Sequence, residues 1–397
     1  MDSSVSSRND RQAENLEDSW CSKFYNGPNP WLARYIYGVL FLITNLLAWA
    51  VRDYGPHALA EMERLDICQG ERDCVGADGV LRVSLGCFTF YFIMFLSTAG
   101  TSKLHDHREL WHSRWWSAKI ILWIALMIIP FFIPFSLIQI YGEVAHFGAG
   151  VFLLIQLISV ISFIRWLNDC CQSDKYGCHF HVMLLATIAY VVCLVGIILM
   201  YIWYAPEASC LLNIFFITWT LVLLQLMTSV SLHPKVNAGF LTPGLMGLYV
   251  VFICWSAIRS EPPEERCDKK AEAATKADWL TIISFIIALL AMVIATFSTG
   301  IDSQCFQVQF RKDDMRAEHD VPYGYGFFHF VFAMGSMYLA MLLISWNTNH
   351  AMRKWTIDVG WTSTWVRVVN EWLAACVYIW MLIAPIVWKS RQTVEPV

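Results

Sequence analysis

The stretch FFHFVFAMGSMYLAMLLISWN, residues Phe327–Asn347, is almost entirely apolar and is long enough to cross a bilayer as a helix. His329 lies near its start, Ser336 near its middle and Asn347 at its end. At 100° per residue, these three residues share one helical face with two alanines. Such a face either contacts a substrate or packs against a neighbouring helix, and the segment by itself leaves both roles open.

The same apolar character extends over the whole chain. Of the 397 residues, 57% are hydrophobic and 15% are charged, whereas soluble domains have about 25% charged residues. The apolar residues come in blocks of about 20 between polar loops, without the alternation of membrane strands. These features predict an all-α, polytopic membrane protein. The net charge of -4 and the absence of a basic stripe argue against a nucleic-acid partner.

We expect ten transmembrane helices, flanked by a polar tail at 1–32 and a short tail at 389–397. An even number of spans puts both termini on one side, and the distribution of Lys and Arg slightly favours the cytosol for them. The expected membrane is an endomembrane or the plasma membrane. The predicted spans are Ala33–Val51, Val80–Thr98, Ile120–Tyr141, Val144–Ile164, His181–Trp203, Leu211–Leu232, Gly239–Ile258, Leu280–Ser298, Gly326–Trp346 and Val366–Trp388.

Two of these spans have unusual features. The third contains Pro130 and Pro134, which predict a kink. The fourth has no formal charge between Glu143 and Arg165, so its helix could be about 39 Å long and could lie tilted in the bilayer. One face of this helix carries small or polar residues, which suit close contact with other helices. They are Ala145, Gly148, Ala149, Gln156 and Ser159.

Histidine and cysteine clusters occur in two cytosolic loops. The stretch LHDHRELWHSRWW contains His105, His107 and His112, but a membrane di-iron enzyme needs more histidines, and an interfacial loop with Trp at headgroup level explains the stretch better. The stretch CCQSDKYGCHFH has zinc-ligand residue types without the paired spacing of ordinary zinc sites, so S-acylation or free thiols are favoured. We therefore expect no metal and no cofactor.

A disulfide is expected in the first outside loop, where an oxidising compartment favours a bond between Cys68 and Cys74. Cys267, in another outside loop, is a competing partner. Sequence signatures of ATPases, serine hydrolases and zinc peptidases do not occur in the chain, and we expect no enzymatic activity.

Four segments, in order, resemble the Serinc (serine incorporator) family. Leu232–Cys267 has a Tyr…WSA pattern followed by an acidic-Pro pair and a cysteine, and Gly148–Asp169 has an IQL core with a trailing Trp-Asn. Tyr323–Trp346 has a Phe-Phe-His entry, and Trp365–Val387 resembles the last span of the family. The resemblance covers nearly the whole chain.

The resemblance implies ten helices in two subdomains crossed by a long tilted fourth helix, with lipid-binding grooves between the subdomains. It also implies energy-independent phospholipid scrambling, or support of serine incorporation into phosphatidylserine and sphingolipids. The alternative is a serine carrier or scaffold for lipid-synthesis enzymes that does not scramble. Partners would be membrane phospholipids, with serine, lipid-synthesis enzymes and a second copy of the chain as further candidates.

If the protein has such a groove, polar residues of the fourth and ninth helices are the candidates to line or support it, because a headgroup costs many kcal/mol to bury without hydrogen bonds. For two of these residues, Gln156 and Ser336, packing between helices is the competing role. The candidate residues are Gln156, Ser159, His329, Ser336 and Asn347.

Overall fold

The computed structural model describes residues 30–59, 74–101, 107–173, 178–262, 267, 278–301, 323–347 and 357–392. Within these ranges every regular element is a helix. The predicted N-terminal tail lies almost wholly outside them. The elements are α2 (Pro30–Leu59), α3 (Cys74–Thr98), α4 (His107–Ser113), α5 (Trp116–Ile128), η1 (Ile129–Phe132), α6 (Phe135–Ser173), α7 (Cys178–Tyr204), α8 (Leu211–Ser231), α9 (Leu241–Arg259), α10 (Asp278–Ile301), α12 (Tyr325–Leu343) and α13 (Trp361–Gln392).

Eight helices in the described ranges are long and apolar enough to cross a membrane by themselves. The pair α4 and α5–η1 passes the same test only when taken together, and it is bent by 68°. The apolar part of α10, Phe285–Thr299, is shorter. The chain is therefore a multi-pass membrane protein, and the count of ten spans stays a prediction.

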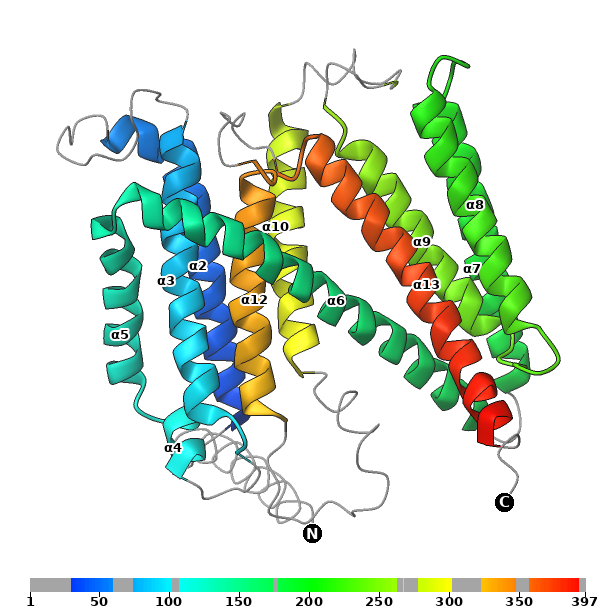
Figure 1. Ribbon diagram of the computed structural model, residues 1–397, viewed down its shortest axis with the longest axis horizontal. Helices are drawn as coiled ribbons and strands as arrows, with labels where there is room; N and C mark the ends of the chain where they lie inside the picture. Colours follow the sequence, from blue (N-terminus) through cyan, green and yellow to red (C-terminus); the bar gives the residue numbers. More distant parts are fainter. Residues whose placement is uncertain are drawn as a thin grey trace, which may run out of the picture.

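The helices form two groups joined by α6 (Figure 1). In one group, α12 packs against α3, α10 and α2, and α5 packs on the outer side of α3. In the other, α9 packs against α7, α8 and α13. Helix α6 crosses diagonally between the groups, and it contacts α12 as well as α9.

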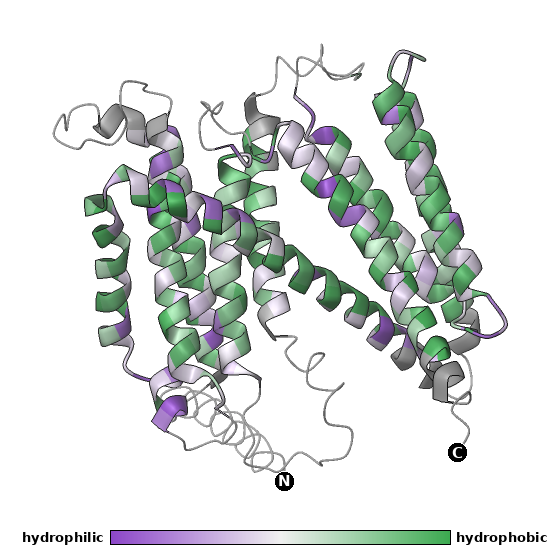
Figure 2. Ribbon diagram, in the orientation of Figure 1, coloured by the Kyte–Doolittle hydropathy of each residue, from purple (hydrophilic) through white to green (hydrophobic). Residues whose placement is uncertain are grey.

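The outward faces of the helices suit a lipid environment. Figure 2 shows α5 and α8 as hydrophobic along most of their length. Large apolar side chains such as Phe132, Phe147 and Met183 are exposed on the surface of the molecule. Because lipid tails are as apolar as these side chains, the helices gain little by hiding them from lipid, and close van der Waals packing has to hold the groups together.

Helix α12 is at the centre of the first group. All but three of its residues are buried, and it packs against four other helices. Small residues let the neighbours approach: a Cβ on Gly148 of α6 would lie 2.0 Å from Met337 Sδ. Ala145 and Ala149, on the same face of α6, are fully buried. The prediction that this face of α6 makes close helix contacts is confirmed.

The predicted boundary between the third and fourth spans is wrong. The two prolines break the chain earlier than expected: α5 ends at Ile128, η1 follows, and α6 already begins at Phe135. The residues up to Tyr141, assigned above to the third span, belong to α6. The kink was predicted correctly, but it separates two helices. Helix α6 has 39 residues, which corresponds to about 58 Å.

Candidate functional site

The polar stripe of α12 lies inside the first helix group. His329 and Ser336 are buried, together with Ala333 and Ala340. Ser336 Oγ donates a hydrogen bond to the Ala333 carbonyl at 2.7 Å, and the Ser336 carbonyl accepts one from Ser84 Oγ of α3 at 3.0 Å. In this conformation the stripe packs between helices and does not face an open groove. Whether these residues support lipid passage stays a prediction.

His329 is part of a buried hydrogen-bonded network at the α4 end of the group. Its Nε2 lies 3.0 Å from His112 Nδ1, and His112 Nε2 lies 3.0 Å from the Tyr323 hydroxyl. Lys119 Nζ and the Tyr37 hydroxyl both donate to the His112 carbonyl. The network fixes α4 against α2, α5 and α12, which is a structural role.

His112 was expected in an interfacial loop, and the structure places it differently. It lies in α4, and its side chain is fully buried. Burial, assisted by the nearby charge of Lys119, lowers the pKa of His112 to about 3. The imidazole is therefore neutral at physiological pH, with one donor and one acceptor for its two partners. His105 and the side chains of the Cys170–His181 cluster lie outside the part of the chain that the structure describes.

Gln156 and Ser159 lie where α6 passes from one helix group to the other. Just before them, Ile155 packs in the core of the α12 group. Just after Gln156, Leu157 and Ile161 pack in a core with α8, α9 and α13. The two polar residues are therefore at the seam between the groups, as the groove hypothesis requires.

The environment of Ser159 is unusual. Its side chain is buried, and its Oγ has no hydrogen-bond partner among the described residues. A serine in a helix normally donates to the carbonyl three or four residues earlier, as Ser336 does. Gln156, one turn earlier on α6, is half-buried. The seam thus contains polar atoms that helix packing does not use.

The remaining polar candidates do not extend this seam. Asn347 is half-buried just after the end of α12, where its backbone N–H donates to the Ile344 carbonyl. Glu371 of α13, a further polar residue within a span, is 1% exposed and accepts a hydrogen bond from Thr220 of α8. The structure brings Gln156 and Ser159 together, but it keeps Glu371 within the second group.

Buried ion pairs in the described ranges were missed by the sequence analysis. Arg82, in the middle of α3, pairs with Asp78 one turn away, and it donates to the carbonyls of Pro130 and Ile133. Both carbonyls lie at the proline break, where the Pro130 carbonyl also accepts the Ile133 N–H, so Arg82 ties α3 to the end of the broken helix. An Asp-x-x-x-Arg spacing inside an apolar span, together with two nearby prolines, is the signal that could have identified the pair.

A second ion pair holds the segment between α12 and α13. Asp358 pairs with Arg367 of α13 and accepts a hydrogen bond from Trp346 Nε1. Arg367 also donates to Ser256 Oγ of α9. This pair therefore joins the segment after α12 to α13 and α9.

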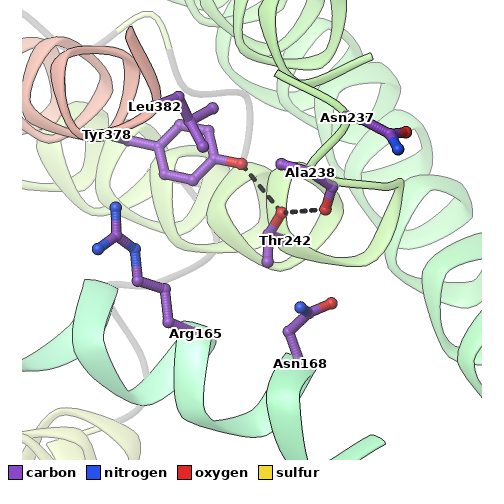
Figure 3. A pocket seen from close by; sticks show the side chains of 7 residues that line it. All are labelled: Arg165, Asn168, Asn237, Ala238, Thr242, Tyr378 and Leu382. Atoms are coloured by element: carbon purple, nitrogen blue, oxygen red, sulfur yellow. Dashed lines mark hydrogen bonds between the residues drawn. The ribbon is translucent and has the colours of Figure 1, made fainter. Parts of the chain in front are cut away.

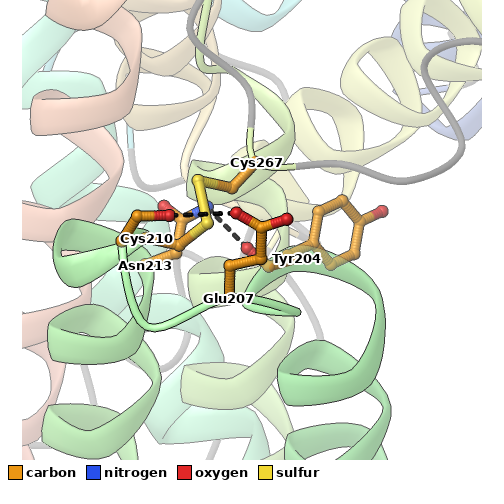
Figure 4. Close-up of a disulfide and its surroundings, with 6 residues drawn as sticks. Tyr204, Glu207, Cys210, Asn213 and Cys267 are labelled. Atoms are coloured by element: carbon orange, nitrogen blue, oxygen red, sulfur yellow. Dashed lines mark hydrogen bonds between the residues drawn. A yellow bond between two sulfur atoms is a disulfide. The ribbon is translucent and has the colours of Figure 1, made fainter.

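A disulfide connects Cys210 with Cys267 (Figure 4). Cys210 precedes α8, and the adjacent Asn213 donates to the Tyr204 carbonyl at the end of α7. The structure thus gives Cys267 a partner that the sequence analysis had not considered. The predicted bond between Cys68 and Cys74 cannot be followed, because Cys68 and the Cys74 side chain lie outside the described residues.

Comparison with known proteins shows which family the chain belongs to. The family model described as "Serine incorporator (Serinc)" matches residues 13–320 and 307–391. A probable serine incorporator from Nematostella vectensis is 26% identical over 371 residues, which cover 80% of this chain and 81% of that protein.

Two further relatives give the same result. A probable serine incorporator from Dictyostelium discoideum is 27% identical, with 79% of this chain and 81% of that protein covered. Serine incorporator 3 of Mus musculus is 24% identical, with 82% of each chain covered. The chain belongs to the serine incorporator (Serinc) family of membrane proteins.

Proposed function

We propose that the protein lets phospholipids cross between the leaflets without an energy source, along the seam where α6 passes between two helix groups that act as subdomains of a ten-span protein. One observation carries the proposal: Ser159 Oγ is buried at this seam without a hydrogen-bond partner among the described residues, next to half-buried Gln156. Polar atoms placed at a helix seam in lipid and not used in packing are candidates to contact a polar ligand.

The physical requirement for such an activity is small. A headgroup crosses the hydrocarbon core slowly because its polar atoms lose their hydrogen bonds to water. A path along a protein has only to offer replacement hydrogen bonds and room for water, so no bond is made or broken and no catalytic residue is needed. The acyl chains stay in the surrounding lipid, which the apolar outer faces of the helices accept.

The α12 residues have a supporting part in this proposal. The Ser336 carbonyl and the His329 side chain hydrogen-bond with α3 and α4, so these residues hold α12 in place within the first group. Asn347 lies near the far end of α12 from His329. The direct contacts are assigned to Gln156 and Ser159 of α6.

The proposed cellular role is support of serine incorporation into phosphatidylserine and sphingolipids, in an endomembrane or the plasma membrane with cytosolic termini. The relatives carry the name serine incorporator, which also favours a second candidate function, a carrier or scaffold that delivers serine to lipid-synthesis enzymes. That function predicts saturable serine binding by the purified protein and does not require the seam.

The seam assignment is tested with Gln156→Leu combined with Ser159→Ala, in purified protein reconstituted into liposomes with fluorescent phospholipid. We expect the scrambling rate to fall about tenfold, since two hydrogen-bonding groups would be lost from the path. Gln139→Leu is the matched control, because it makes the same chemical change at an exposed position of the same helix. A folded double variant that scrambles as fast as wild type would refute the assignment.

A further inference from the structure

A polar pocket lies at the end of α6 that is farther from α12. Its cavity of about 300 Å³ is lined by residues from three parts of the chain (Figure 3). Arg165 and Asn168 come from α6, Tyr378 from α13, and Thr242 from the first turn of α9. Asn237 and Ala238, in the connection before α9, complete the polar lining.

One wall of the pocket is held rigidly. The Tyr378 side chain is 2% exposed, and its hydroxyl donates to Thr242 Oγ1 at 3.2 Å. Thr242 Oγ1 donates in turn to the Ala238 carbonyl at 3.4 Å. Figure 3 shows this chain of hydrogen bonds across the pocket, with Arg165 and Asn168 facing it from α6. The hydroxyl groups are therefore oriented before any ligand arrives.

The described lining of the pocket offers hydrogen-bond donors. Among the described residues that line it, Arg165 contributes a guanidinium and none contributes a carboxylate. The first turn of α9 also contributes, because a helix N-terminus carries a partial positive charge and the residue before α9, Phe240, provides no side-chain cap. A guanidinium, an amide and a helix N-terminus around one cavity are donors that suit an oxyanion.

The pocket lies at the ends of two candidate membrane segments. The candidate membrane segment of α6 ends at Asn168, and that of α9 begins at Leu241, so the lining is at the end of both spans. Along α6, Arg165 is six residues beyond Ser159, which is about 9 Å of helix. The pocket is therefore adjacent to the end of the seam that the proposed function uses.

We propose that this pocket binds the phosphate group of a phospholipid, with Arg165 as its charged ligand and Asn168 as a hydrogen-bond donor. The inference deepens the proposed function and rests on it for the lipid as the source of the phosphate. A free phosphate ion has the same binding chemistry. The pocket would hold a headgroup at the mouth of the seam, before it enters or after it leaves.

Binding is tested separately from transport. Dioctanoyl phosphatidylserine is titrated onto purified full-length protein in detergent micelles, and binding is followed by microscale thermophoresis. Arg165→Gln should weaken binding about tenfold, because a charge-assisted contact to the phosphate would be lost. Lys235→Gln is the control. It removes one positive charge from an exposed residue in the connection between α8 and α9, outside the lining of the pocket, and it should leave the affinity within about twofold.

A second arm identifies the source of the phosphate. Inorganic phosphate at millimolar concentration is added to the complex; failure to displace the lipid supports a lipid-specific site. Arg165-dependent binding of inorganic phosphate without lipid binding supports the pocket as a phosphate site and removes its link to lipid handling. Equal weakening by both substitutions, or no binding of either probe to the folded protein, would overturn the inference.

The two proposals fail in different ways. Arg165-dependent lipid binding by a protein that does not scramble would leave the pocket standing and remove the proposed function. If the protein scrambles lipids but Arg165→Gln leaves its lipid binding unchanged, the proposed function would stand and the pocket proposal would be removed. Tyr378→Phe, which keeps the ring and removes the hydroxyl, checks the wall: it should weaken binding less than Arg165→Gln, because Tyr378 orients Thr242 and carries no charge.

Discussion

Single small residues decide how closely the helices of the first group approach one another. At Gly86 of α3, an added Cβ would lie 2.3 Å from the backbone carbonyl oxygen of Leu126 in α5. A backbone atom cannot move aside as a flexible side chain can. At Gly150 of α6, by contrast, an added Cβ would meet no atom within 4 Å. The sequence alone does not indicate which of these two helical glycines is in close contact with a neighbouring helix.

Replacing each glycine by alanine tests this difference. Gly86→Ala should destabilise the protein by about 1–3 kcal/mol, because α3 and α5 have to separate to accommodate the methyl group. Gly150→Ala should be neutral or slightly stabilising, since alanine favours a helix. Thermal unfolding of both variants in detergent measures the effect. Equal stability of the two variants would contradict the close α3–α5 contact.

Single-residue contacts also explain why the role of the polar stripe of α12 could not be predicted from the sequence. Helical periodicity correctly placed His329 and Ser336 on one face, but periodicity does not say what the face meets. The answer depends on His112 of α4 and Ser84 of α3, which are distant in sequence. Partners of this kind cannot be deduced from a single helix.

At the scale of elements, the break between α5 and α6 shows what proline can and cannot predict. The sequence indicated a kink at Pro130 and Pro134 but not that a helix would end there. The outcome depends on Arg82, which donates from a different helix to the carbonyls of Pro130 and Ile133 at the break. Because these hydrogen bonds are tertiary contacts, the start of α6 was placed too late.

Arg82→Met tests the support of this break. We expect a loss of about 3–5 kcal/mol, because Asp78 would stay buried as an uncompensated charge. Adding Asp78→Asn should recover part of the loss, since the amide carries no charge. The free energies of unfolding of the two single variants and the double variant form a thermodynamic cycle. Additive effects in that cycle would mean that the two side chains do not interact.

At the scale of the whole molecule, the segmented hydrophobicity was enough to predict an all-α membrane protein, and four ordered segments were enough to indicate its family. The grouping of helices on either side of α6 required long-range contacts. The partner of Cys267 shows what the sequence could not predict. Cys210 is 57 residues away in sequence, and no sequence pattern between the two cysteines indicates that they form a disulfide.

The Cys210–Cys267 disulfide should stabilise the second helix group. In the chain-entropy account, closing a loop of this length contributes about 4 kcal/mol. Replacing both cysteines by serine should lower the melting temperature of the protein. Adding reductant should then lower the melting temperature of this variant by less than it lowers that of wild type.

The same bond tests the orientation of the chain. The predicted topology puts this disulfide outside, so a membrane-impermeant maleimide should label Cys210 and Cys267 in intact cells only after reduction. Labelling of these two residues that requires permeabilised cells would contradict the cytosolic placement of the termini, if the protein is at the cell surface.

Scrambling by the purified wild-type protein tests the central claim most directly. The protein is reconstituted into liposomes with fluorescent phospholipid, and dithionite is added to quench the outer leaflet. We predict quenching well beyond the roughly one half of the signal that protein-free liposomes lose, because lipids of the inner leaflet would reach the outer one along the α6 seam. A stop at one half, with protein shown to be folded and inserted, would contradict the account and favour serine delivery.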